Sequence, residues 1–270
     1  MMLWEFLNTL EKIGIHLSEE DQEYLNYTLT ILGKLGKKAD FLYTEEDFLL
    51  RALGNLFEGS FENREKSMRE FVKGYTQEFN FKRLEGSIEE VLEEVQREYD
   101  LVFTQYRKFF FKRGFSDVAL ERTQGLALWV YKKGCSPTLK KVCLPVDFSE
   151  RSLKQVQTVE YLRGFFEFEF DLVHSLNTHR FKEKLNPKDY ESSKRDKEEE
   201  ALQMYRDVFG EKQLSLVFLE GSPYKELIRF INSAGYDFVI VGRRGRGMRE
   251  NIGSVSLSLL RGVRCPILVL

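Results

Sequence analysis

The chain has 270 residues, a hydrophobic fraction of 42%, a charged fraction of 31% and a formal net charge of −2. This length exceeds one typical domain and accommodates two small ones, and the ordinary composition argues against a disordered or fibrous protein. The near-balanced charge gives no bulk electrostatic reason to expect a nucleic-acid partner, and no run approaches the roughly 20 apolar residues that span a bilayer.

The first residues lack the features of a secretory signal. The apolar stretch in residues 1–10 is short, Glu5 stands where basic residues are typical, and no small-residue cleavage site follows. We therefore expect a leader helix and a cytoplasmic location. The cysteines Cys135, Cys143 and Cys265 form no CxxC pair and are expected to be reduced thiols. The three histidines lack metal-ligand spacing, so no metal site is predicted.

An internal repeat organises the chain. The tetrapeptide LEGS occurs at 84–87 and again at 219–222, and each copy precedes a helical pattern that ends in Tyr-Asp before an apolar run. From Tyr-Asp onward the two copies align without a gap, so that Ser116-Asp117 corresponds to Gly253-Ser254. The predicted organisation is a leader helix at 1–10, a first domain at 11–133, a polar linker at 134–139 and a second domain at 140–270.

The second copy alternates strands and helices. The predicted strands cover 142–147, 168–174, 214–220, 238–241 and 266–270, and the predicted helices cover 150–165, 196–209, 223–234 and 254–262. This alternation requires parallel strands with helical crossovers, so the fold class is α/β. Ser222 and Pro223 are predicted to cap and start a helix. The charged stretch 181–200 is predicted to be a solvated loop that runs into a helix, the alternative being a regulated arm with modification sites at Ser192 and Ser193.

Three motifs of the second copy resemble the universal stress protein family. KKVCLPVDFSERS places Asp147 at the carboxyl end of a strand and before a helix, FVIVGRRGRGMRENIGSV joins a strand to a GxxG turn and a Gly-Ser helix start, and CPILVL closes the chain. The resemblance covers nearly everything after the leader. It implies two tandem doubly wound parallel five-stranded sheets of order 3-2-1-4-5, an adenine nucleotide alpha hydrolase-like fold, packed as an internal pseudo-dimer.

In this strand order the ligand crevice lies outside the carboxyl ends of strands one and four. The resemblance implies that the second copy binds ATP there, with or without Mg²⁺. Around the adenosine it implies Pro145, Val146, Asp147 and Val173. Around the phosphates it implies Val241, Gly242, Arg244, Gly245, Gly253, Ser254 and Val255. Glycines allow close backbone approach and a helix start favours an anion, although seven residues separate Gly245 from Gly253 where the family has nine.

The first copy lacks these residue types. At the corresponding positions it carries Ser18, Gln105, Lys108 and the pair Ser116-Asp117. Because an acidic residue at a helix start repels phosphate, we predict that the first domain is degenerate and serves as a structural partner. The aromatic residues of its segment 107–115, RKFFFKRGF, are expected to fill the lost pocket, the alternative being a nucleic-acid or lipid contact.

The sequence contains no GxSxG elbow, no Walker ending and no Cys-His pairing of known spacing, so no catalytic residue is assigned. His16 and His174 are expected to be hydrogen-bonded core residues. We predict a stress-linked nucleotide-binding or signalling module in which ATP orders the 242–253 loop and changes a surface that a protein partner contacts. Two alternatives remain, a nucleotide-free scaffold of the same fold and a slow ATP hydrolase that uses the same cleft.

Overall fold

The computed structural model describes residues 10–45, 58–108, 113–179, 184–243 and 254–270. The chain divides between Pro137 and Thr138 into two compact units, which we call the first unit (residues 9–137) and the second unit (residues 138–270). Except for the buried Leu10, the predicted leader helix lies outside the described residues.

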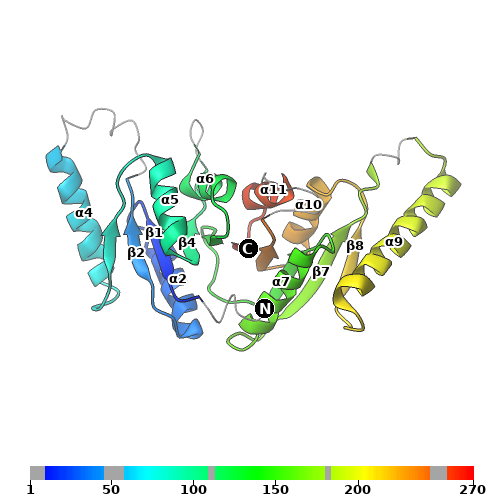
Figure 1. The fold of residues 1–270 in the computed structure, drawn as a ribbon, viewed down its shortest axis with the longest axis horizontal. Helices are drawn as coiled ribbons and strands as arrows, with labels where there is room; N and C mark the ends of the chain where they lie inside the picture. Colours follow the sequence, from blue (N-terminus) through cyan, green and yellow to red (C-terminus); the bar gives the residue numbers. More distant parts are fainter. Residues whose placement is uncertain (1–9, 46–57, 109–112, 180–183, 244–253) are drawn as a thin grey trace. The chain divides into compact units, whose positions relative to one another are not determined.

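Strands and helices alternate along both units (Figure 1). The described elements of the first unit are β1 (Ile13–Leu17), α2 (Gln22–Leu35), β2 (Asp40–Tyr43), α4 (Glu58–Lys73), β3 (Phe81–Arg83), α5 (Ile88–Glu98), β4 (Leu101–Gln105), α6 (Phe115–Arg122) and β5 (Ala127–Tyr131). Those of the second unit are β6 (Lys141–Pro145), α7 (Glu150–Leu162), β7 (Glu169–Ser175), α9 (Pro187–Phe209), β8 (Leu216–Leu219), α10 (Lys225–Ser233), β9 (Phe238–Val241), α11 (Ser254–Gly262) and β10 (Ile267–Val269).

The strand pairs within each unit are parallel. The strand order is β3-β2-β1-β4-β5 in the first unit and β8-β7-β6-β9-β10 in the second. Counted within each unit, both orders are 3-2-1-4-5, so the predicted doubly wound α/β class is confirmed. Every residue of β1 and of β5 is buried, which is typical of parallel strands covered by helices on both faces.

The repeated Tyr-Asp pair ties the first strand of each unit to the fourth at their amino ends. The Asp100 carboxylate accepts hydrogen bonds from the main-chain N–H groups of Glu11 and Lys12, both at 3.0 Å. Asp237 accepts equivalent bonds from the two residues at the start of β6, at 2.9 and 3.1 Å. These N–H groups precede or begin a strand, so the carboxylate satisfies donors that would otherwise lack a partner.

The tyrosine of each pair joins the second strand to the same edge. Tyr99 donates its hydroxyl to Asp40 at 3.1 Å, and Tyr236 donates to Asp171 at 2.7 Å. Burial, together with the neighbouring carboxylate, raises the pKa of both phenols, so each remains a donor at neutral pH. We call these contacts the Tyr-Asp clamps, one in each unit.

The two LEGS segments adopt the same backbone turn but start their helices differently. Gly86 and Gly221 have φ angles of 105° and 101°, a region that favours glycine. Ser87 caps α5 in a capping box, whereas the Ser222 hydroxyl accepts a hydrogen bond from the N–H two residues later. Helix α10 begins at Lys225, two residues later than the predicted start at residue 223.

Helix α9 is longer than predicted. It begins at Pro187, with Asn186 as its N-cap, rather than at residue 196. Proline suits the first helical turn because its missing N–H would have had no helical partner there. Only Ala201 and Phe209 of this helix are buried, which explains why its polar sequence resembled a loop.

The predicted gap-free alignment of the two copies beyond their fourth strands is wrong. In the first unit Val102 pairs with Leu128, and at the matching place in the second unit Val239 pairs with Ile267. The second unit therefore has two more residues between these strands. The difference arises in the connection that includes α6 or α11.

Ser116 and Asp117 consequently do not stand where Gly253 and Ser254 do. Ser116 is buried inside α6, as Ser256 is inside α11. Asp117 is buried in the first turn of α6, where a carboxylate near the helix amino end is favourable.

Candidate functional site

The second unit has a topological switch point between β6 and β9, where the strand order reverses. Main-chain pairing of these strands ends at Cys143 and Val239. Beyond that pair, the Gln155 side chain donates from Nε2 to the carbonyl oxygens of Pro145 and Ile240, at 2.9 and 2.8 Å. Since proline has no N–H to donate, a side-chain amide takes over the bridging of the two strands at their carboxyl ends.

Sequence reasoning missed Gln155. The side chain is 2% exposed and lies in the buried stripe of α7, beside Val156 and Val159. A glutamine within an apolar stripe is the signal that could have indicated it, because a buried amide needs hydrogen-bond partners.

The predicted adenosine residues Pro145, Val146 and Val173 lie together at the carboxyl ends of β6 and β7, and all three are buried. The Val146 N–H donates to the Val173 oxygen at 2.9 Å. Nδ1 of the half-buried His174 lies 2.9 Å from the Val146 oxygen, and its ring packs on Phe148 at 4.6 Å between centroids. Burial lowers the pKa of His174, so the imidazole is neutral near pH 7 and donates to the carbonyl, as a core histidine would.

Asp147 lies two residues after the end of β6 and is half-buried. Its Oδ1 accepts hydrogen bonds from the N–H of Ser149 at 3.1 Å and from the hydroxyl of Ser152 at 3.3 Å. Phe148, between Asp147 and Ser149, has a φ of 54°, which is an uncommon backbone conformation for a non-glycine residue. The carboxylate thus stabilises the turn into α7, where Ser149 is the N-cap but makes no side-chain cap bond of its own.

The turn after β9 is tied to α11. The buried Ser256 hydroxyl donates to the Gly242 oxygen at 2.7 Å and approaches the Arg243 oxygen at 3.3 Å. Arg243 is 6% exposed. The pKa of Lys154 is lowered by burial and by the charge of Arg243, so two cations lie close enough to interact beside this turn.

The start of α11 also contacts α10. The Ser254 hydroxyl lies 2.8 Å from the Tyr224 hydroxyl. Val255 follows in the first turn and is half-buried, and Val241 ends β9 with a buried side chain. The predicted phosphate residues Arg244, Gly245 and Gly253 lie outside the described residues.

In the first unit, side chains cross the equivalent edge. Gln105, at the place of Gly242, donates to Asp21 at the start of α2, at 2.6 Å. Arg107 reaches Ser18, which matches Asp147, and pairs with Glu19 at 2.6 Å. These contacts join the carboxyl ends of β4 and β1 through polar side chains. Residues 109–112 of the aromatic segment lie outside the described residues.

An aromatic stack closes the same place in the first unit. Phe115 lies on the His16 ring with centroids 3.7 Å apart and an interplanar angle of 12°. His16 is flanked by the hydroxyls of Thr44 and Thr104, at 2.6 and 3.3 Å. Complete burial, with a smaller contribution from the Arg107 charge, lowers the pKa of His16 to about 3. The imidazole is therefore a neutral core residue.

The described residues contain no cluster of three or more His, Cys, Asp or Glu side chains that could hold a metal ion. In the same part of the chain, no helix is both long and apolar enough to cross a bilayer.

Fold and strand order define the class as a tandem of two doubly wound α/β units of the kind found in universal stress proteins. Over 99% of this chain and 94% of the other, it resembles a protein of Pseudomonas aeruginosa UCBPP-PA14 assigned to that group, with a TM-score of 0.63 and 16% identity. It also resembles a universal stress protein from Archaeoglobus fulgidus DSM 4304, with a TM-score of 0.57 and 14% identity over 95% of each chain. At these identities the likeness shows the fold alone.

The sequence itself identifies the family. Residues 138–270 match the model of the Universal stress protein family, so the second unit is identified as a member of that family. The comparison with curated proteins gives no significant match.

Proposed function

We propose that the second unit binds an adenine nucleotide, ATP, and that the protein is a stress-linked nucleotide-binding or signalling module of the cytoplasm. The observation that carries the proposal is the switch point, where Gln155 replaces main-chain pairing between β6 and β9. Asp147 follows one of these strands and Gly242 follows the other. Ligands of open α/β sheets bind outside the carboxyl ends of the strands at such a point.

The adenosine would contact the ends of β6 and β7. Pro145, Val146 and Val173 supply buried apolar surface there, which suits a planar base. A carboxylate accepts hydrogen bonds from hydroxyl groups, so Asp147 is our candidate for the ribose. Its Oδ1 is already held by the turn into α7, which fixes the orientation of the group.

The phosphates would lie beside the turn after β9. Burial and the charge of Arg243 lower the pKa of Lys154, so two positive charges lie near this turn, and phosphate groups would be attracted to them. The first turn of α11, from Ser254, adds the positive end of a helix dipole. Arg244, Gly245 and Gly253 complete the proposed set, and Mg²⁺ would accompany the triphosphate.

The proposed mechanism is occupancy rather than catalysis. The lowered pKa of His174 makes it a weak base near neutral pH. Ser256 connects the turn after β9 to α11, and Ser254 connects α11 to Tyr224, the N-cap of α10. A nucleotide held by that turn would therefore change the surface of α10 and α11, which a protein partner could recognise.

Thermal unfolding with and without Mg·ATP tests the proposal. ATP at about 100 times its dissociation constant should stabilise the protein by about 2.7 kcal/mol. Asp147→Ala should abolish the ATP-dependent shift, whereas Ser18→Ala, the matched change in the first unit, should leave it intact. The absence of a shift in the wild type at millimolar ATP, with no nucleotide found in the purified protein by mass spectrometry, would favour the nucleotide-free scaffold.

Phosphate release distinguishes a binding module from a slow hydrolase. For a binding module, we expect the wild type to release phosphate from Mg·ATP no faster than the Asp147→Ala variant does. Activity that survives repurification and disappears in Asp147→Ala would instead assign hydrolysis to this site.

A further inference from the structure

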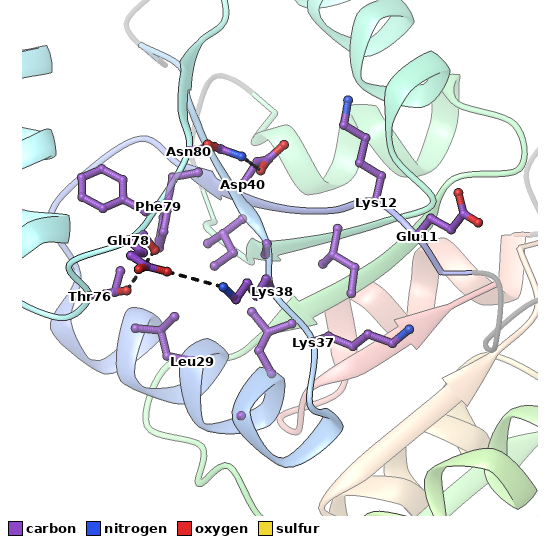
Figure 2. Close-up of a pocket in the computed structure, with 16 residues that line it drawn as sticks. Glu11, Lys12, Leu29, Lys37, Lys38, Asp40, Thr76, Glu78, Phe79 and Asn80 are labelled. Atoms are coloured by element: carbon purple, nitrogen blue, oxygen red, sulfur yellow. Dashed lines mark hydrogen bonds and ion pairs between the residues drawn. The ribbon is translucent and has the colours of Figure 1, made fainter.

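The first unit contains a hollow of about 600 Å³ at the amino edge of its sheet, opposite the carboxyl ends of its strands (Figure 2). Its apolar lining includes Ile15, Leu32 and Phe41, none more than 3% exposed, and the half-buried Leu29 and Phe79. The end of α2 and the segment that leads into β3 form its sides. This volume is typical of small-molecule sites, which combine an apolar lining with a few polar groups.

Small residues create the hollow. Ala39 precedes Asp40, the acceptor of the first Tyr-Asp clamp, and Phe170 precedes Asp171, the acceptor of the second. An alanine therefore stands where the second unit has a phenylalanine. Gly33, on the α2 wall, faces open space, because a Cβ built there would meet no atom within 4 Å.

The rim carries a cation without a carboxylate partner in the described structure. Lys37 donates from Nζ to the main-chain oxygen of Leu10 at 3.2 Å. The neighbouring Lys38 faces Glu78 at 3.6 Å, and both side chains are about nine-tenths exposed, so this ion pair contributes little and can be exchanged.

The Asp40 carboxylate of the rim is held by neutral donors. Asp40 accepts hydrogen bonds from Tyr99 and from the Asn80 amide. Figure 2 shows Asn80 and Asp40 pointing toward each other, and Glu11 far from Lys38 and Glu78. Neutral donors thus engage the Asp40 carboxylate, and the exposed Glu78 faces Lys38. Among the lysines of the rim, Lys37 is the one whose contacts in the described part of the chain include no carboxylate.

We propose that this hollow is a second ligand site, which binds a small carboxylic acid with an apolar body. The apolar part would contact Leu29 and Phe79, the half-buried apolar residues of the lining, and the carboxylate would pair with Lys37 and Lys38. The site is separate from the proposed nucleotide site, because all of its residues belong to the first unit.

Calorimetric titration of the full chain with decanoate tests the proposal. We expect saturable binding, weakened at least about ten-fold by Ala39→Phe, which copies the residue of the second unit, and by several-fold in Lys37→Gln. Asp147→Ala should bind decanoate like the wild type, which separates this site from the proposed ATP site. Decyltrimethylammonium, which has the same tail and the opposite charge, should bind at least about ten-fold more weakly than decanoate.

Circular dichroism establishes that Ala39→Phe is folded, and Gly33→Leu, which enters open space from the helix, serves as a second blocking variant. Decanoate binding that is unchanged in both blocking variants would overturn the proposal. So would equal binding of decanoate and its cationic analogue, because the lysines would then have no role. The absence of saturable decanoate binding to the wild type would overturn it as well.

Discussion

The two units share the Tyr-Asp clamps at the amino edge of the sheet and differ at the carboxyl edge. At the amino edge, Asp100 and Asp237 make equivalent hydrogen bonds to the start of the first strand of their unit. At the carboxyl edge, main-chain pairing in the first unit extends to Ile15 and Phe103, one pair further than in the second. Both units keep the clamps and the same strand order. The side chains at the carboxyl ends of the first and fourth strands can therefore differ without altering that order.

Removal of the aromatic stack of the first unit should have the largest effect on stability. Phe115→Ala should destabilise the first unit by about 4 kcal/mol, because it deletes a ring that is 4% exposed and packed on His16. Ser254→Ala, an exposed change at the start of α11, should cost under about 1 kcal/mol. Urea unfolding measures both. Similar costs for the two variants would show that the first unit is not closed by this stack.

Acid should weaken the first unit through His16. Its pKa is about 3 in the folded protein and ordinarily 6.5, so the unfolded chain takes up the proton first and stability falls as pH drops through that window. Between pH 7 and pH 4, protonation of His16 in the unfolded chain should lower the free energy of unfolding by about 3 kcal/mol. Urea unfolding at both pH values, followed by Trp129 fluorescence in a Trp4→Phe background, measures it.

His16→Gln provides the control for the acid experiment, since glutamine keeps hydrogen-bonding capacity but does not titrate. The variant should lose about 3 kcal/mol less than the wild type between these pH values. An equal acid-induced loss in both proteins would assign the effect to other groups.

The smallest effects should come from the clamps, and they should be equal in the two units. Tyr99→Phe and Tyr236→Phe each remove a hydroxyl that donates to a carboxylate, and each should cost about 1–2 kcal/mol. Tyr224→Phe, which alters an exposed hydroxyl contact, should change stability by less than about 0.5 kcal/mol. A clear cost in only one unit, measured by urea unfolding, would contradict the equivalence of the clamps.

The fold could be predicted because its signals are local and occur twice. Alternating apolar runs and helical patterns predicted the parallel strands, and the repeated Tyr-Asp pair indicated equivalent places in the two copies. The helix α9 was underestimated because only Ala201 and Phe209 are buried, so the first part of the helix lacks an apolar stripe. Its Asn186 cap and Pro187 start were the available signals.

The candidate site was predicted only in part. Pro145, Val146 and Val173 come together as expected, since strand order decides which strand ends are neighbours. Gln155 and Ser256 were missed because their partners are main-chain oxygens, and no sequence pattern shows where a carbonyl points. The hollow was missed because it results from small residues such as Gly33 and Ala39, whose effect depends on their neighbours in space.

The Gln155 bridge has a consequence for how such proteins diverge. One glutamine satisfies both carbonyls where β6 and β9 stop pairing, so the parting of the strands is built into the protein and does not require a bound molecule. A unit of this fold can then carry different residues at the carboxyl ends of these strands, as the first unit does with the stacked His16 and Phe115, while the rest of the sheet stays the same. The residues at this edge can therefore change in few mutational steps while the strand order stays the same.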